Sequence, residues 1–171
     1  DYGSRLAMNA DGIFDVKREK TEIDGIEASA TWSFTSDSSV GIAYSNPTGE
    51  YDSDADGSVD TDLDATNISP ERINLFWSQQ WTSDFDTRVQ ASNLLDRDYQ
   101  NAVGESYADF DGYTLLDITA TWMVGNGQLQ ASVQNLTNEE YITYYSQAQT
   151  NNERYFAGRG RTVSLGYTYR F

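Results

Sequence analysis

The chain has 171 residues, enough for one domain, and 38% of them are hydrophobic, as is ordinary for a folded protein. It has no cysteine and no histidine, which excludes disulfides, thiol catalysis, His-based triads and zinc sites built on these ligands. The net charge of −16 opposes binding to nucleic acid, since phosphate contacts need clustered Lys and Arg.

Alternating side chains predict strands in the first part of the chain. Residues 4–14 form a plausible strand, and the KREK cluster at 17–20 is interpreted as surface charge in a short outer loop. In 25–34 and 39–45, apolar residues alternate with small or polar ones, as expected of strands with one apolar and one polar face. The short polar turn FTSDSS joins these two strands.

An acidic segment, GEYDSDADGSVDTDLD, follows at 49–64. Its start matches D-x-D-x-D-G, in which spaced carboxylates surround a hard cation and the glycine, here Gly57, permits a sharp turn. The match is incomplete, because the twelfth position is Leu63 where a calcium loop has a bidentate Glu. A solvated acidic loop and a calcium site are both open interpretations. The ligands of the calcium site would be Asp52, Asp54, Asp56 and Asp60.

The remaining strands alternate in the same way, and RTVSLGYTYRF at the end does so without error. These five strands are expected at 72–81, 86–95, 113–124, 127–136 and 161–171. Short polar turns join some neighbours, whereas long segments occupy 46–71, 96–112 and 137–160. Short turns on one side and long loops on the other are typical of an outer-membrane barrel with its short side in the periplasm. If Phe171 ends in the periplasm, strand parity places all three long loops outside the cell.

Two strand ends repeat a pattern, because VQASNLLDRDY and ASVQNLTNEEY both contain Asn-Leu, four residues and then Tyr. One interpretation is that Asn93 and Asn135 cap the strand ends while Tyr99 and Tyr141 anchor at the outer membrane interface, where amphipathic rings gather. The other is a recurring hairpin edge with no role in ligand binding.

These segments together resemble the C-terminal third or so of a TonB-dependent outer-membrane receptor of the ferric-siderophore kind. The resemblance rests on DGIEASATW, the two Asn-Leu strand ends, FDGYTLLDITATW and YFAGRGRTVSLGYTYRF, which together span nearly all 171 residues. It implies an all-β fold, in which 1–171 is a transmembrane antiparallel β-barrel segment of about eight strands. These would be the last eight of a 22-stranded barrel whose plug domain is absent from this chain.

The resemblance also implies a function, the uptake of ferric siderophores in the bacterial outer membrane, with this chain supplying barrel wall and extracellular loops. The expected partners are TonB through the missing plug, the barrel-assembly machinery, lipid and lipopolysaccharide. The ending SLGYTYRF fits the signal that such barrels present for assembly. The residues of this signal are Ser164, Gly166, Tyr169 and Phe171.

The last long loop carries the side chains expected to contact an anionic, hydroxamate-rich ligand, because Tyr and Arg offer directed donors. Alternatively, its aromatics anchor at the interface and its arginines meet lipopolysaccharide phosphates, as expected for Arg159 and Arg161. Calcium in 52–64 would order that loop and offset negative charge where the ferric chelate approaches. The expected ligand-binding residues are Tyr144, Tyr145, Arg154 and Tyr155.

Two other protein classes compete with the receptor. A self-closed small barrel of eight strands could have a structural or adhesive role. Inward positions are mostly Ser, Thr, Gly and Ala, which would underfill a narrow barrel but suit the wall of a wide one, so we expect the wide barrel. A secreted, calcium-stabilised β-domain is the other competitor. We expect no enzyme, because the adjacent Glu139 and Glu140 do not form a positioned acid and base pair.

Overall fold

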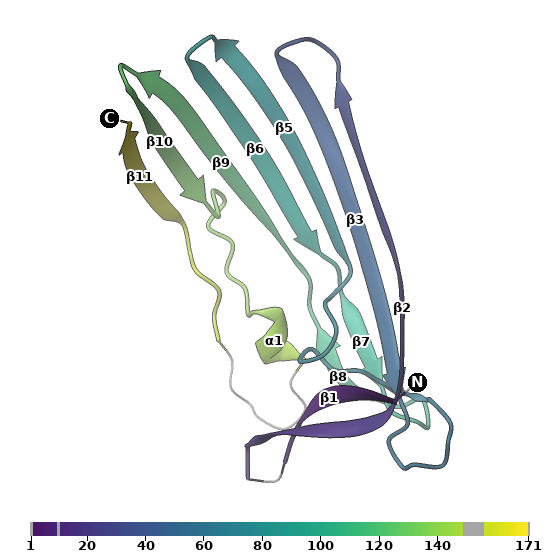
Figure 1. Cartoon of the computed structure of the whole chain (residues 1–171). Coiled ribbons are helices and arrows are strands. Elements are labelled where there is room, and N and C mark those ends of the chain that lie inside the picture. Colours follow the sequence, from purple (N-terminus) through teal and green to yellow (C-terminus); the bar gives the residue numbers. More distant parts are fainter. Residues whose placement is uncertain (1, 10, 149–155, 171) are drawn as a thin grey trace.

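The computed structural model describes every residue except 1, 10, 149–155 and 171. Its main element is an antiparallel sheet in which eight strands are hydrogen bonded in chain order. The first of them pairs only with the start of the second, and this hairpin lies at the loop end of the sheet, away from the long strands (Figure 1). These strands are β1 (Tyr2–Met8), β2 (Phe14–Ser33), β3 (Ser38–Tyr51), β5 (Arg72–Thr82), β6 (Phe85–Leu94), β9 (Tyr113–Val124), β10 (Gly127–Gln134) and β11 (Thr162–Tyr169). The fold is all-β, as the alternation predicted.

Three smaller elements lie in the long connections. The two-residue β4 (Thr61–Asp62) pairs with the end of β3. The hairpin of β7 (Arg97–Gln100) and β8 (Ser106–Phe110) forms a separate two-stranded sheet, and the helix α1 (Tyr144–Gln147) follows β10. Within the described ranges, no helix has the length and apolar character needed to cross a bilayer.

The first two strands differ from their predicted positions. The expected strand at 4–14 is wrong in its bounds, because β1 ends at Met8 and β2 begins at Phe14. Between them the chain turns, with the Asn9 side chain accepting a hydrogen bond from the backbone N–H of Ile13. The KREK cluster at 17–20 lies in β2, not in a loop. It is extended because residues 14–20 of β2 pair with β1, while residues 21–33 pair with β3.

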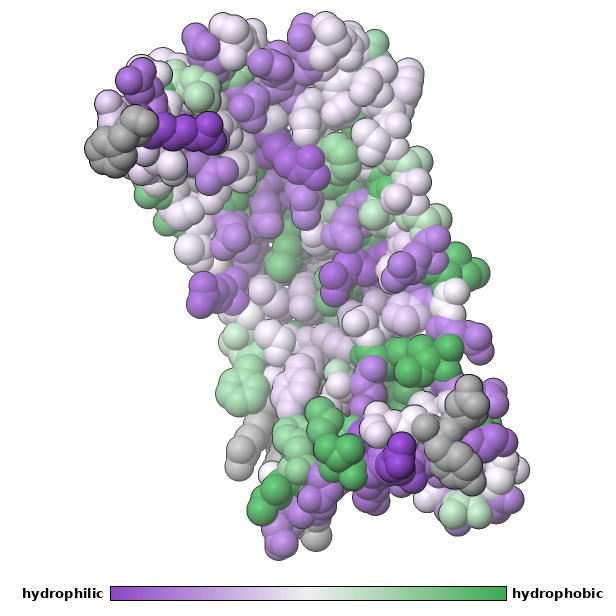
Figure 2. All heavy atoms as spheres, viewed as in Figure 1, coloured by the Kyte–Doolittle hydropathy of each residue, from purple (hydrophilic) through white to green (hydrophobic). Residues whose placement is uncertain are grey.

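The two faces of the sheet have different chemistry, as the alternation predicted. Paired residues share a face, so the strand register aligns rows that cross the sheet. One apolar row is Trp32, Val40, Trp77, Val89, Ile118, Val133 and Val163. The next row on the other face is Ser33, Ser39, Ser78, Arg88, Thr119, Ser132 and Ser164. In Figure 2, hydrophilic side chains are spread along the visible face.

The apolar face has no second layer over it in the described structure. Trp32, in β2, is 68% exposed, and Val163, on the same face in β11 at the far edge of the sheet, is 71% exposed. An apolar surface of this extent indicates an apolar environment rather than water.

The sheet is open. β1 and β11 stand at the two ends of the strand order, and no pairing among the described residues joins them. The self-closed small barrel considered from the sequence is therefore wrong for this chain. The small side chains on the polar face agree with this finding, because they would leave a narrow barrel underfilled.

The buried core lies in the long connections at one end of the sheet, opposite the three short turns (Figure 1). We call this cluster the loop core. Its residues are Leu63, Ile68, Tyr99, Phe110, Tyr144 and Ala148. The connections predicted as long loops are thus partly ordered, because they bury apolar side chains against one another.

Candidate functional site

Tyr144 lies at the centre of the loop core and joins all three long connections. It is 9% exposed, and its hydroxyl donates to the Ile68 carbonyl at 3.0 Å and also hydrogen bonds to the Tyr99 hydroxyl. Its ring meets Phe110 edge-on, with 4.9 Å between centroids. Burial raises the pKa of Tyr144 well above its ordinary value, so this phenol is a neutral hydrogen-bonding group.

The predicted ligand-binding residues lie in different environments. Tyr144 faces the protein interior, and its contacts are those of a packing residue. Tyr145, its neighbour in α1, is 41% exposed and free to meet a molecule outside the loops. Arg154 and Tyr155 lie outside the described residues. Tyr145 is therefore the described member of this set that can contact a ligand.

The two tyrosines of the repeated pattern also differ from their prediction. Tyr99 is fully buried in the loop core, so its expected role as an interface anchor is wrong. Tyr141 packs against Tyr113 at 4.2 Å between centroids. Its ring also occupies the space beside Gly158, where any larger side chain would collide with it.

Of the two asparagines of the repeat, Asn135 holds a strand end, as one interpretation predicted, whereas Asn93 bonds a side chain within the sheet. Asn135 has a positive φ of 51°, and its Nδ2 donates to the carbonyls of Glu139 at 2.9 Å and Arg159 at 3.0 Å. This side chain therefore ties the end of β10 to the approach to β11. Asn93, near the end of β6, donates across to the Thr114 hydroxyl at 2.8 Å.

The acidic loop is closed at its base by β4, where Tyr51 pairs with Thr61. Asp52 is 7% exposed, whereas Asp54 and Asp56 are exposed. One carboxylate oxygen from each of these three residues lies within 4.8 Å of the others. We call them the Asp trio.

The fourth predicted metal ligand, Asp60, is outside the Asp trio. Its position follows from the closure of the loop, because its backbone amide donates to the Tyr51 carbonyl as the chain turns into β4. The Lys20 ammonium donates to the Gly57 carbonyl at 2.6 Å. Hydrogen bonds from Ser58, together with the charge of Lys20, hold the pKa of Asp56 below its ordinary value.

Sequence reasoning missed side chains that fasten the loops to one another. Arg97 donates from β7 to the carbonyls of Pro47 at 3.1 Å and Ser69 at 3.2 Å. The Asn67 amide bonds both the N–H and the carbonyl of Leu6 at 3.0 Å, as a neighbouring strand would. Nothing in the sequence pattern indicated these contacts, since the partners are 28 to 61 residues apart.

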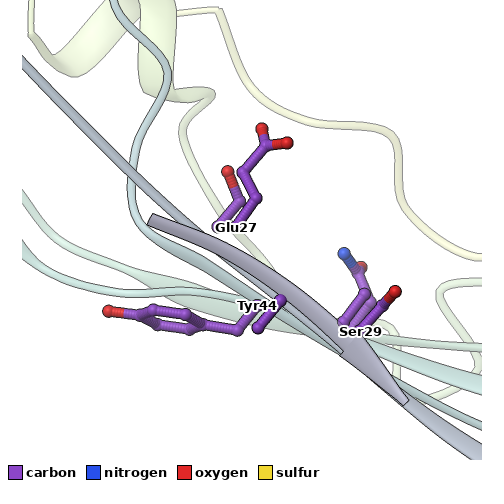
Figure 3. Close-up of a pocket in the computed structure, with 7 residues that line it drawn as sticks. Glu27, Ser29 and Tyr44 are labelled. Atoms are coloured by element: carbon purple, nitrogen blue, oxygen red, sulfur yellow. The ribbon is translucent and has the colours of Figure 1, made fainter. Parts of the chain in front are cut away.

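A hollow of about 420 Å³ lies on the polar face where β2, β3 and β5 meet. Figure 3 shows Glu27 and Ser29 rising from one side of the strands, while Tyr44 leaves on the other. The Tyr44 hydroxyl donates to the Glu71 carboxylate at 2.9 Å. The hollow is an open, partly acidic stretch of wall, so it favours water and cations over an anionic ligand.

The predicted assembly-signal residues lie in β11, apart from Phe171, which is outside the described residues. The Ser164 hydroxyl bonds that of Ser132 at 2.6 Å on the polar face. Gly166 pairs with Gln130, and the half-exposed Tyr169 belongs to the apolar face. Their role in assembly stays a prediction.

Comparisons of this chain with known proteins agree with one another on the family. The profile of a family described as TonB dependent receptor-like, beta-barrel matches residues 8–136. The ferric aerobactin receptors of Escherichia coli and Klebsiella pneumoniae are each 27% identical over 177 residues, covering 97% of this chain and 23% of the relative. The copper transporter OprC has a TM-score of 0.78 at 16% identity, over 99% of this chain and 27% of its own, which shows a shared fold. The chain thus spans about a quarter of these relatives' length.

Proposed function

The chain belongs to the TonB-dependent receptor β-barrel family, and from this premise we propose that it forms barrel wall and ligand-binding loops of a ferric-siderophore receptor. Receptors of this family lie in the outer membrane and are transporters, not enzymes. The observation that carries the proposal is the sheet itself, with a continuous apolar face, a polar face and an ordered loop core at one end. A lipid-facing wall with a binding end needs these three features.

We also propose an orientation in the membrane. We place the loop core and the acidic loop outside the cell, and the three short turns with the C-terminus in the periplasm. The apolar rows then face lipid, and exposed aromatic side chains such as Tyr169 and Trp122 lie toward the periplasmic interface. Lipopolysaccharide phosphates would meet the arginines of the last connection, Arg159 and Arg161.

The substrate class is proposed as a ferric siderophore with carboxylate and hydroxamate groups, in keeping with the two relatives named ferric aerobactin receptors. We assign ligand contact to Tyr145, with Arg154 and Tyr155 from the following segment. Tyr144 anchors α1 to the loop core and so fixes the position of Tyr145. TonB acts through a plug contributed by the rest of the receptor. The barrel-assembly machinery recognises the signal in β11 and inserts the receptor into the outer membrane.

The test is uptake of ⁵⁵Fe-labelled ferric aerobactin by cells without their own siderophore receptors that express the complete reading frame carrying this chain. We expect uptake that disappears when the host's tonB gene is deleted. Equal uptake with and without the protein, at normal levels of the protein in the outer membrane, would exclude this substrate. Uptake that persists without TonB would contradict the mechanism.

The ligand assignment has its own variant. Tyr145→Ala removes an exposed side chain with few packing duties, so we expect weaker binding of ferric aerobactin with the protein level unchanged. Val103→Ala, in the exposed tip of the β7–β8 hairpin, is the control. Identical affinity in Tyr145→Ala and the control would remove Tyr145 from the binding site.

A further inference from the structure

One carboxylate oxygen of the acidic loop is buried without a protein partner. Asp52 is 7% exposed, and its Oδ2 accepts a hydrogen bond from the Gly57 amide at 2.9 Å. Its Oδ1 has no hydrogen-bond partner, and in the part of the chain that the structure describes it is the only buried side-chain oxygen or nitrogen in this condition. A buried carboxylate oxygen is costly unless a donor or a metal ion meets it.

Two further carboxylates converge on this buried one. The chain bends sharply here, with φ of 63° at Ala55, between Asp54 and Asp56, and 98° at Gly57, just after Asp56. As a result Asp52, Asp54 and Asp56 bring one oxygen each within 4.8 Å of the others. Asp54 and Asp56 are exposed, so an ion from solvent can reach the buried Asp52 through them.

Lys20, a cation that contacts this loop, bonds elsewhere. Lys20 directs its ammonium to the Gly57 carbonyl, and its field acts on Asp56, while Asp52 Oδ1 keeps no partner. One ammonium also offsets only one of the three negative charges. The trio therefore has both the unsatisfied oxygen and the excess negative charge that a bound cation would balance.

We propose that the Asp trio binds one calcium ion, with Asp52 as its buried ligand and Asp54 and Asp56 as the ligands on the solvent side. All the ligands are oxygens, which suits a hard cation and not zinc or copper. Calcium accepts six to eight oxygens in flexible geometry and takes the remainder from water or backbone, whereas magnesium demands a stricter octahedron.

Calcium at this position would act on the loop core. The Asp52 amide donates to the Lys20 carbonyl of β2 at 2.9 Å, and Leu63, just after β4, is 1% exposed within the loop core. The ion thus closes a loop whose two ends attach to β2 and to the loop core. Calcium should protect this segment from cleavage by a protease that cuts at aspartate.

The test is isothermal titration of calcium into the complete, detergent-purified protein after chelator treatment, with magnesium as the comparison ion. We expect one site with a Kd of about 10⁻⁴ to 10⁻³ M or tighter, the range of extracellular calcium modules. Asp52→Asn keeps the size of the side chain and should weaken binding at least tenfold. Asp54→Asn, at an exposed position that leaves the fold intact, should do the same.

Asp60→Asn is the matched control, because Asp60 lies in the same loop but outside the Asp trio. Its calcium affinity should equal that of the unmodified protein. No calcium binding at about 10 mM, well above the weakest such modules, would overturn the proposal, as would equal losses in Asp54→Asn and Asp60→Asn. Binding is measured without siderophore, so this result is independent of the proposed transport function.

Discussion

Tyr144 shows how one residue type can serve two purposes in the same loop. A tyrosine in a long loop of this family is a reasonable candidate for ligand contact, and Tyr145 keeps that role because it is exposed. Tyr144 instead turns inward, where its hydroxyl bonds the Ile68 carbonyl and the Tyr99 hydroxyl. Which neighbour is exposed depends on the direction of α1, and the residue types alone do not determine it.

The contribution of the Tyr144 hydroxyl can be measured with Tyr144→Phe. This change leaves the ring packing but deprives the buried Ile68 carbonyl of a donor, which costs about 1 kcal/mol. We expect amide hydrogen exchange in the loop core to become roughly fivefold faster. Tyr145→Phe, at the exposed neighbour, should leave exchange unchanged. Equal exchange in both variants would show that the Tyr144 hydrogen bonds do not hold the loop core.

The raised pKa of Tyr144 gives the loop core a pH dependence. Burial is the main cause, Arg97 opposes it and Asp64 adds to it. Because the folded pKa is above the unfolded value of 10.0, this group's stabilisation is complete below pH 10 and is lost as the pH rises further. We expect the folded protein and Tyr144→Phe to show equal tyrosinate absorbance between about pH 10 and 11.

Unfolding in denaturant at about pH 11, where an ordinary tyrosine is mostly ionised, should then separate the two proteins by nearly the absorbance of one tyrosinate. If the folded protein already exceeded Tyr144→Phe by this amount at about pH 11, Tyr144 would titrate normally. The inferred burial would then be contradicted.

At the scale of the element, a glycine in β3 makes room for an aromatic ring of β5. Gly41 pairs with Phe76, and a Cβ added at Gly41 would collide with the Phe76 ring. The ring is also packed by a second neighbour, because the Arg88 guanidinium lies 3.8 Å from its centroid. The ring therefore has little space into which it could move.

Gly41→Ala should accordingly destabilise the barrel by about 1–3 kcal/mol, the usual cost of overpacking. The measurement is urea unfolding of the complete protein in lipid bilayers. In a Phe76→Leu background, which removes the ring, the same Gly41→Ala change should cost clearly less. An equal cost in both backgrounds would show that the collision is not the cause.

The strands could be predicted from sequence where alternation alone defines them. Side-chain direction in a strand is a local property, so β9 and β11 were placed within two residues of their observed ends. The start of β2 could not be predicted in this way, because the charged segment 17–20 is extended only through its pairing with β1. Of the four aspartates that the acidic motif predicts as metal ligands, three lie together in the Asp trio, and their binding of a metal stays a prediction. The burial of Tyr99 depends on contacts far along the chain.

At the scale of the whole molecule, the apolar face defines the environment of the sheet. Ile118 stands in the middle of an apolar row, between Val89 and Val133. Thr121, three residues along β9, lies on the polar face opposite Asp86. These two positions on one strand thus separate an effect of lipid from an effect of charge on the strand.

Ile118→Arg should destabilise the barrel by about 2–4 kcal/mol, the cost of a cation near the bilayer midplane. Thr121→Arg should cost much less, because its guanidinium would lie on the polar face of the wall, beside the Asp86 carboxylate. Both are measured by urea unfolding of the complete protein in bilayers. Equal costs would mean that the face carrying Ile118 does not meet lipid, and a larger cost for Thr121→Arg would reverse the proposed orientation of the wall.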